Sequence, residues 1–86
     1  GPNSFRIALL EALGNMNNRL ADMQMKQFLN VPIPAFQNTA FNILAQKRKL
    51  RISDVDALLD AEAVSTVYLA LNWKWVVSYV KCRRIK

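Results

Sequence analysis

The chain has 86 residues and a formal net charge of +6, because 12 lysines and arginines outnumber 6 acidic residues. This length supports one domain with a limited core, and a hydrophobic content of 52% argues against disorder. The absence of histidine removes the commonest general base and the commonest metal ligand, so we expect no enzyme, no metal site and no cofactor. The single cysteine, Cys82, allows no intramolecular disulfide and indicates an intracellular protein of the nucleus or cytoplasm.

The first four residues, Gly-Pro-Asn-Ser, resemble the remnant that protease cleavage of an affinity tag leaves, and we exclude residues 1–4 from the fold prediction. We expect residues 5–86 to form a single helical domain that is a fragment of a larger protein. Apolar residues crowd positions 5–13, which predicts a short helix that is either buried or paired with another element, and Gly14 offers a left-handed stop after it.

A second helix is predicted over residues 16–29. Its inward positions are expected to be Met16, Leu20, Met23 and Phe28, with polar residues facing water. The prolines of Val31-Pro32-Ile33-Pro34 then interrupt the helical pattern, since proline lacks a backbone donor and favours extended geometry before it.

A third helix is predicted over residues 35–46, with an inward stripe of Phe36, Ala40, Ile43 and Leu44. It ends in a basic cluster, Lys-Arg-Lys-Leu-Arg over residues 47–51. Cations at the end of a helix stabilise the negative end of its dipole, so part of this cluster has a structural explanation.

The segment after the basic cluster predicts a short strand over residues 50–52 and then a helix capped by Ser53, with Asp56 three residues on. A further helix follows, in which Val64, Val67, Tyr68 and Leu71 form the apolar set. Beyond it, aromatic and β-branched residues alternate over 73–80, which favours a strand. The alternative is one continuous helix over residues 63–81 and an all-α bundle of four or five helices.

The order of helix, tight turn, helix and β-prone basic tail resembles a winged helix-turn-helix module, and Ser65-Thr66-Val67-Tyr68 looks like the start of a recognition helix. The resemblance covers about half of the chain and implies no specific family. The predicted fold is therefore a small, mainly α, single helical domain with a helix-turn-helix or winged-helix-like second half.

The leading functional prediction is non-catalytic binding of DNA or RNA with largely electrostatic affinity, because two basic clusters flank the predicted helix-turn-helix. The exposed positions of the recognition helix would reach base edges, and the flanking cations would hold phosphates. The predicted nucleic-acid-binding residues are Lys47, Arg48, Lys49, Arg51, Ser65, Thr66, Lys74, Arg83, Arg84 and Lys86. Four acidic residues between positions 54 and 62 weigh against direct contact with DNA, since they would repel phosphates if they faced the duplex.

The alternative prediction is a docking or self-association module that binds a protein in an apolar groove between the methionine-bearing helix and the tryptophan segment. The partner-binding residues would be Met23, Met25, Trp73, Trp75 and Tyr79. We expect no small-molecule substrate. We also expect no membrane span, because Asn72 and Lys74 interrupt the longest apolar stretch.

Overall fold

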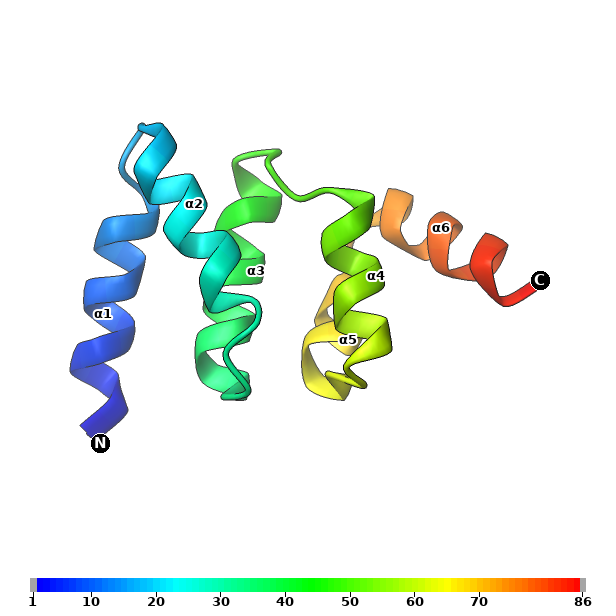
Figure 1. Cartoon of the computed structure of the whole chain (residues 1–86), viewed down its shortest axis with the longest axis horizontal. Coiled ribbons are helices and arrows are strands. Elements are labelled where there is room, and N and C mark those ends of the chain that lie inside the picture. Colours follow the sequence, from blue (N-terminus) through cyan, green and yellow to red (C-terminus); the bar gives the residue numbers. More distant parts are fainter. Residues whose placement is uncertain (1, 86) are drawn as a thin grey trace.

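The computed structural model describes residues 2–85, with side chains described for residues 3–83. These residues form six α-helices, and the described part of the chain contains no strand (Figure 1). The helices are α1 (Pro2–Gly14), α2 (Arg19–Phe28), α3 (Pro34–Gln46), α4 (Ile52–Asp60), α5 (Val64–Ala70) and α6 (Lys74–Ile85). The mainly α prediction is confirmed, with more helices than the four or five of the bundle alternative.

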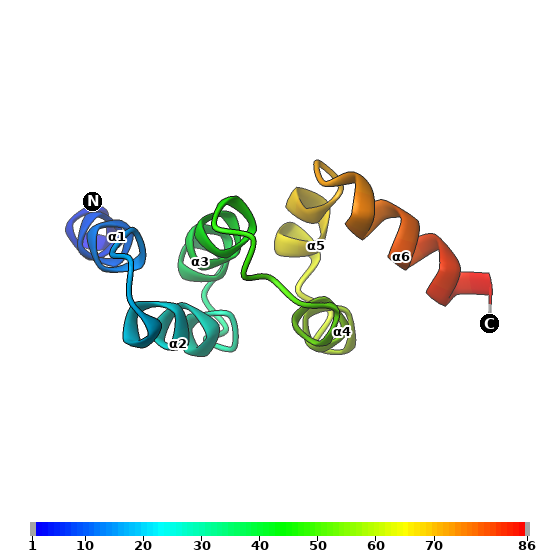
Figure 2. The same ribbon diagram turned by 90° about the horizontal axis from the view of Figure 1, so that it is seen from above.

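The helices form two rows, seen end-on in Figure 2. Helices α1, α3 and α5 lie in one row, α2 and α4 lie in the other, and α6 extends from the far end. Short connections join successive helices, and α1 packs on α2, α2 on α3, and α4 on α5. The result is an elongated array of 41 × 27 × 19 Å in which α3 packs on α1, α2 and α5.

Helix α3 is the centre of the core, because it has neighbours on several sides. The predicted stripe of this helix is buried as expected. Phe41 and Ala45 are also buried, on positions that the stripe does not include. The amide of Gln37 is buried as well, and it donates to the carbonyl of Leu29 over 3.1 Å at the end of α2. A buried polar group of this kind needs a partner, and here it caps a helix.

The inward face of α2 differs from the predicted one. Leu20 and Met23 are exposed, whereas Ala21 and Met25 are buried at a spacing of four residues. Asn18 caps the helix by accepting a hydrogen bond of 2.8 Å from the backbone of Ala21, so α2 begins at Arg19, later than expected. The face formed by Ala21 and Met25 is the one that packs against α1 and α3, because a small and a flexible side chain allow the helices to approach closely.

Gly14 does not adopt the left-handed conformation that the sequence predicted. It is the last residue of α1, its φ is not positive, and it is buried. A Cβ atom at this position would lie 2.7 Å from both Ile43 Cδ1 and Met25 Sδ. The glycine therefore allows close approach of three helices. The positive-φ residues in the described chain are instead Arg48 and Glu62, each in the turn after a helix.

The predicted strand over residues 50–52 is not formed, and α4 starts two residues earlier than a cap at Ser53 would allow. Its N-cap is Arg51, whose backbone N–H donates to the Asp54 carboxylate over 2.8 Å. Asp54 rather than Asp56 therefore takes the role that the sequence assigned to the third residue after the cap. This carboxylate also lies in the first turn, where the helix dipole favours a negative charge.

The prediction of a strand over residues 73–80 is wrong, because this segment belongs to the start of α6. One face of this helix carries Val76, Tyr79 and Arg83 at spacings of three and four residues. Val76 is buried, and Tyr79 and Arg83 form hydrogen bonds to α4. The helical alternative is confirmed in type but not in continuity, since a turn at residues 71–73 separates α5 from α6. The described residues thus supply helices where the winged-helix reading required wing strands.

Candidate nucleic-acid interface

The array has one end that is strongly basic. The connections after α1, α3 and α5 lie at this end (Figure 1). We define the basic end by the cations on or beside these connections: Arg19, Lys47, Arg48, Lys49, Arg51 and Lys74. The connections at the opposite end, residues 29–33 and 61–63, carry no lysine or arginine and include Glu62. The alternation of helix direction thus gathers charges that are far apart in the sequence.

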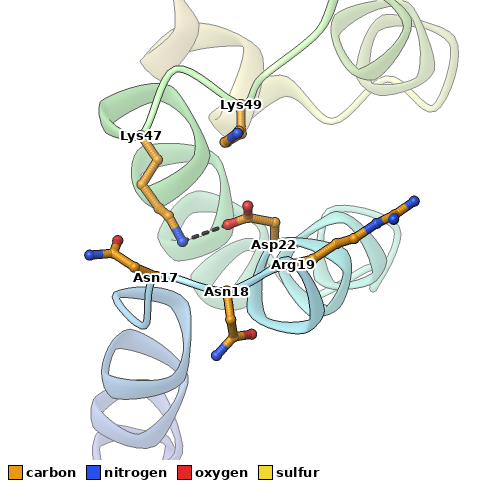
Figure 3. A pocket seen from close by; sticks show the side chains of 6 residues that line it. All are labelled: Asn17, Asn18, Arg19, Asp22, Lys47 and Lys49. Atoms are coloured by element: carbon orange, nitrogen blue, oxygen red, sulfur yellow. Dashed lines mark ion pairs between the residues drawn. The ribbon is translucent and has the colours of Figure 1, made fainter.

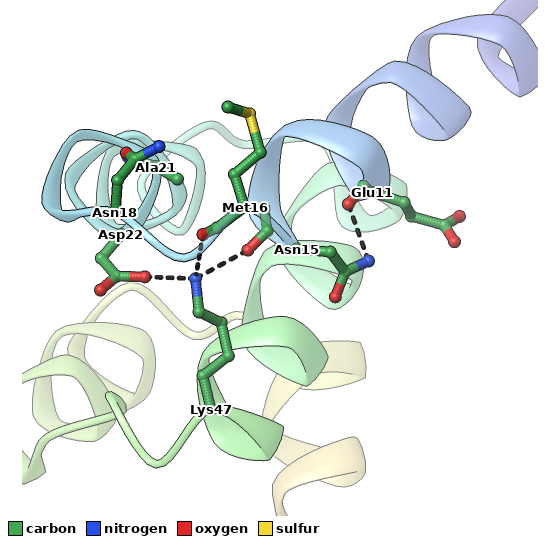
Figure 4. A network of polar contacts seen from close by, with 8 residues as sticks. Glu11, Asn15, Met16, Asn18, Ala21, Asp22 and Lys47 are labelled. Atoms are coloured by element: carbon green, nitrogen blue, oxygen red, sulfur yellow. Dashed lines mark hydrogen bonds and ion pairs between the residues drawn. The ribbon is translucent and has the colours of Figure 1, made fainter.

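Lys47 has a structural role at this end. Its ammonium group forms an ion pair with Asp22 and donates to the carbonyls of Gly14 and Met16, each over 2.9 Å (Figure 4). These carbonyls lie at the end of α1, where backbone acceptors have no intrahelical partner. The ion pair holds the pKa of the Asp22 carboxyl below its ordinary value. Lys47 therefore joins α1, α2 and α3, and its charge is largely neutralised.

The neighbours of Lys47 are free to meet a ligand. Arg48 and Lys49 are exposed, and neither forms an ion pair within the described chain. Arg48 has a φ of 60°, a conformation that bends the chain sharply after α3. Arg51 is also exposed, and its guanidinium reaches only the carbonyl of Arg48, at 3.5 Å. Three of the four predicted cations in this cluster are thus available.

A polar hollow of about 670 Å³ opens beside Lys49. Figure 3 shows its lining side chains, which come from the start of α2, the connection before it and the turn after α3. They are Asn17, Asn18, Arg19, Asp22, Lys47 and Lys49. Arg19 is exposed, as expected of a polar residue on the water-facing side of this helix, but the sequence analysis did not predict it as a binding residue. The sequence signal for this position was that Arg19 follows Asn17 and Asn18, which are typical of the residues before a helix N-terminus.

A second hollow, of about 590 Å³, combines indole rings with cationic and polar groups. We call it the tryptophan hollow; its lining residues are Ala45, Gln46, Arg48, Leu50, Trp73 and Trp75. Trp73 is half-buried and packs against the core, while 40% of the Trp75 surface is exposed. Trp73 therefore contributes to the core. Both also border the basic end, because Lys74 stands between them.

Helix α5 does not present the surface expected of a recognition helix. Ser65 is exposed, but Thr66 is fully buried and donates to Asn38 Oδ1 on α3 over 2.7 Å. Thr66 therefore cannot contact a base. Val64 and Tyr68 were expected in the core, yet they expose 73% and 76% of their surfaces. Apart from Ser65, the exposed side of α5 is thus mostly apolar, and Thr66 joins α5 to α3.

The acidic residues of α4 are paired with cations of other helices. Arg83 pairs with Asp56 over 3.2 Å and also with Asp60, and Tyr79 donates a hydrogen bond to Asp56. This hydrogen bond raises the pKa of Tyr79. Asp54 pairs with Lys26 of α2. Arg83 and Tyr79, both predicted as binding residues, therefore fasten α6 to α4.

Two of the remaining predicted residues have no described side chain. The side chain of Arg84 is not among those described, and Lys86 lies beyond the described residues. Lys74, in contrast, is exposed as the first residue of α6. The described cations of the tail, Lys81 and Arg83, are therefore not among those of the basic end, to which α6 contributes Lys74.

The predicted groove between the methionine-bearing helix and the tryptophan segment is not formed by the described residues. Met25 is fully buried, Met23 is exposed, and α2 and α6 lie on opposite sides of α4 in Figure 2. A different apolar surface appears on α4 and α5. We call it the α5 apolar face; its residues are Leu59, Val64, Val67, Tyr68 and Leu71, and with Glu62 they line a hollow of about 330 Å³.

Neither a metal site nor a membrane span emerges from the described residues. No group of three or more of their cysteine, aspartate and glutamate side chains is placed to hold a metal ion. Among the same residues, every helix is too short or too polar to cross a bilayer. Comparisons of the chain with known protein families, with curated proteins and with solved structures find no match.

Proposed function

We propose that this chain is a non-catalytic nucleic-acid-binding domain that contacts its ligand through the basic end with largely electrostatic affinity. The observation that supports the proposal is the gathering of exposed, unpaired cations from three connections: Arg19, Arg48, Lys49 and Lys74 form no ion pair within the described chain. Three of the four acidic residues that argued against phosphate contact are paired with cations, Asp54 with Lys26 and both Asp56 and Asp60 with Arg83. The fourth, Glu62, lies in the connection at the opposite end. Asp22, which lies at the basic end, pairs with Lys47. A phosphate backbone lying across this end would meet these unpaired positive charges, because Asp22 there is neutralised by Lys47.

Contact through the basic end replaces the recognition-helix mode in this proposal. Helix α4, the turn at residues 61–63 and helix α5 still follow one another in helix-turn-helix order. A recognition helix needs exposed polar side chains at its N-terminal end. In α5 these positions hold exposed Val64 and buried Thr66, so Ser65 alone could reach a base edge.

The test is a titration of labelled nucleic acid at two salt concentrations, followed by fluorescence anisotropy. The variant Lys49→Gln/Lys74→Gln removes two cations of the basic end. The matched control Arg6→Gln/Lys81→Gln removes two exposed cations of α1 and α6 that lie away from it. For a single strand, each phosphate contact contributes about 0.7 to the salt slope, so the first variant should lower the slope by about 1.4.

The control should leave the slope close to that of the unmodified chain. Equal losses in the two variants would mean that net charge alone governs binding and would contradict a defined interface. Absence of binding at both salt concentrations would refute the nucleic-acid proposal.

A second candidate function is docking of a partner protein on the α5 apolar face. The observation that favours it is the large exposure of Val64 and Tyr68 beside Leu71, which exposes 47% of its surface. Contiguous exposed apolar residues on a small domain mark interaction sites more often than chance. The charged Glu62 at the edge of this hollow would favour a helix that carries a facing cation.

This candidate predicts that Tyr68→Ser abolishes protein complex formation, because an aromatic anchor contributes a large share of interface energy. The matched control is Leu20→Ser, which changes a side chain of similar exposure, 71%, on α2. A complex that survives Tyr68→Ser, or that both variants abolish equally, would count against docking at this face.

A further inference from the structure

We propose that the ligand of the basic end is a single-stranded nucleic acid, and that one of its bases stacks on Trp75 in the tryptophan hollow. This inference rests on the proposed function and adds the class of ligand and the residue that selects it. Single strands differ from duplexes in offering unpaired bases, which proteins bind by stacking them on aromatic side chains.

The shape and chemistry of the hollow fit a base. Its volume of about 590 Å³ lies within the range of small-ligand sites in proteins, about 300–1,000 Å³. Trp75 supplies an indole that is partly exposed, and Leu50 and Ala45 supply a buried apolar floor. A tryptophan that is partly exposed beside an apolar floor can offer its ring to a planar ligand.

Polar groups at the hollow fit the rest of a nucleotide. Gln46 is the last residue of α3 and is exposed, so its amide can both donate to and accept from a base edge. Arg48 lines the same hollow, and its guanidinium can bind a phosphate through two hydrogen bonds. No lining residue is acidic. The hollow therefore offers an aromatic surface, an amide and a cation together.

Cations beside the tryptophan hollow extend this site along the path of a nucleic-acid strand. Lys49 borders the polar hollow with Arg19, while Arg48, one residue earlier, lines the tryptophan hollow. The backbone of a single strand could therefore follow the cations from α2 to α6, with a base turned toward Trp75 at one end. A duplex keeps its bases stacked inside and could use only the cations.

The experiment compares a labelled single strand of DNA with the duplex of the same sequence, and follows both anisotropy and intrinsic tryptophan fluorescence. Trp75→Leu removes the aromatic ring but keeps apolar bulk. It should weaken single-strand binding about tenfold, in keeping with the contribution of one stacked base, and leave duplex binding unchanged. The matched control, Tyr68→Leu, removes an exposed aromatic ring on α5 and should change neither.

Fluorescence provides a readout that needs no variant. A base stacked on an indole should quench the emission of the unmodified chain on addition of the single strand. Single-strand binding without quenching, or with equal affinity for Trp75→Leu, would overturn the stacking inference. If Lys49→Gln/Lys74→Gln still weakened binding in that case, the proposed function would stand. Failure of the chain to bind either nucleic acid would overturn both.

Discussion

Replacing Lys47 by methionine should lower stability without weakening nucleic-acid binding as much as a change at Lys49. Methionine keeps the apolar stem of the side chain and removes the ammonium group. In the structure this group donates to the carbonyls of Gly14 and Met16 and pairs with Asp22. The adjacent Lys49 is exposed and forms no ion pair within the described chain, so Lys49→Met is the matched control.

The size of the effect follows from the two carbonyl bonds. Each contributes about 0.5–1.5 kcal/mol to stability, so their loss should lower the free energy of unfolding by about 1–3 kcal/mol. For a domain of this length, each kcal/mol shifts the melting temperature by about 4–8 °C. Thermal unfolding followed by circular dichroism should therefore show a fall of at least about 4 °C for Lys47→Met. The melting temperature of Lys49→Met should stay near that of the unmodified chain.

Acid titration gives a second check on the same contact. The pKa of Asp22 is lowered from the ordinary value of 3.8, chiefly by its bond to Lys47. The contribution of this pair is fully present above pH 3.8 and is lost as the pH falls through the lower, folded-state pKa. Below pH 3.8, the stability of Lys47→Met should therefore depend less on pH. Equal melting temperatures and equal acid sensitivity in the two variants would refute the structural role of Lys47.

Three further changes test the packing that positions the interface. Gly14→Ala should destabilise the domain by up to about 2 kcal/mol, since overpacking outweighs the gain in helix propensity, and adding Ile43→Val should recover part of the loss in a double-mutant cycle. Thr66→Val should lower stability by about 1 kcal/mol in urea unfolding through loss of the bond between α5 and α3, while leaving nucleic-acid affinity unchanged. Tyr79→Phe isolates the ionisation of Tyr79 when the ultraviolet absorbance of both proteins is titrated with pH and the two curves are subtracted. The difference should show a tyrosine that ionises above its ordinary pKa of 10.0, because Tyr79 is bonded to Asp56. A midpoint at or below pH 10.0 would contradict this contact. The bond from the protonated Tyr79 hydroxyl stabilises the fold fully below pH 10.0. This contribution to the free energy of unfolding is lost as the pH rises through the higher, folded-state pKa of Tyr79.

Periodicity predicted the helices whose buried faces are rich in large apolar residues. Helix α3 is the clearest case, because Phe36, Ile43 and Leu44 define its inward stripe in the sequence and are buried in the structure. Helix α2 offers two partly apolar faces, and Leu20 and Met23 lie on the exposed one, whereas Ala21 and Met25 lie on the buried one. Which face of α2 is buried depends on its packing against α1 and α3, and the spacing of apolar residues within α2 carries no information about that packing.

The candidate site was harder to predict, because its residues owe their roles to partners far along the chain. Lys47 and Arg48 are adjacent in the sequence, yet Asp22 neutralises the first and leaves the second free. Alternating aromatic residues around Trp73 favoured a strand, although Trp73 precedes α6 and Trp75 lies within it. The basic cluster was visible in the sequence, whereas its meeting with Arg19 and Lys74 required the arrangement of the helices.

The central place of α3 has a consequence for how the domain opens. Because α3 packs on α1, α2 and α5, its amides should exchange with solvent only when both halves of the array separate, and they should be the slowest of the described chain. Helix α6 is held by the buried Val76 and by the bonds of Tyr79 and Arg83 to α4, and it packs on fewer helices than α3, so its amides should exchange sooner. A ligand bound across the basic end would join the connections after α1, α3 and α5. It would then couple the local opening of α6 to that of the centre and make the array exchange as one cooperative unit.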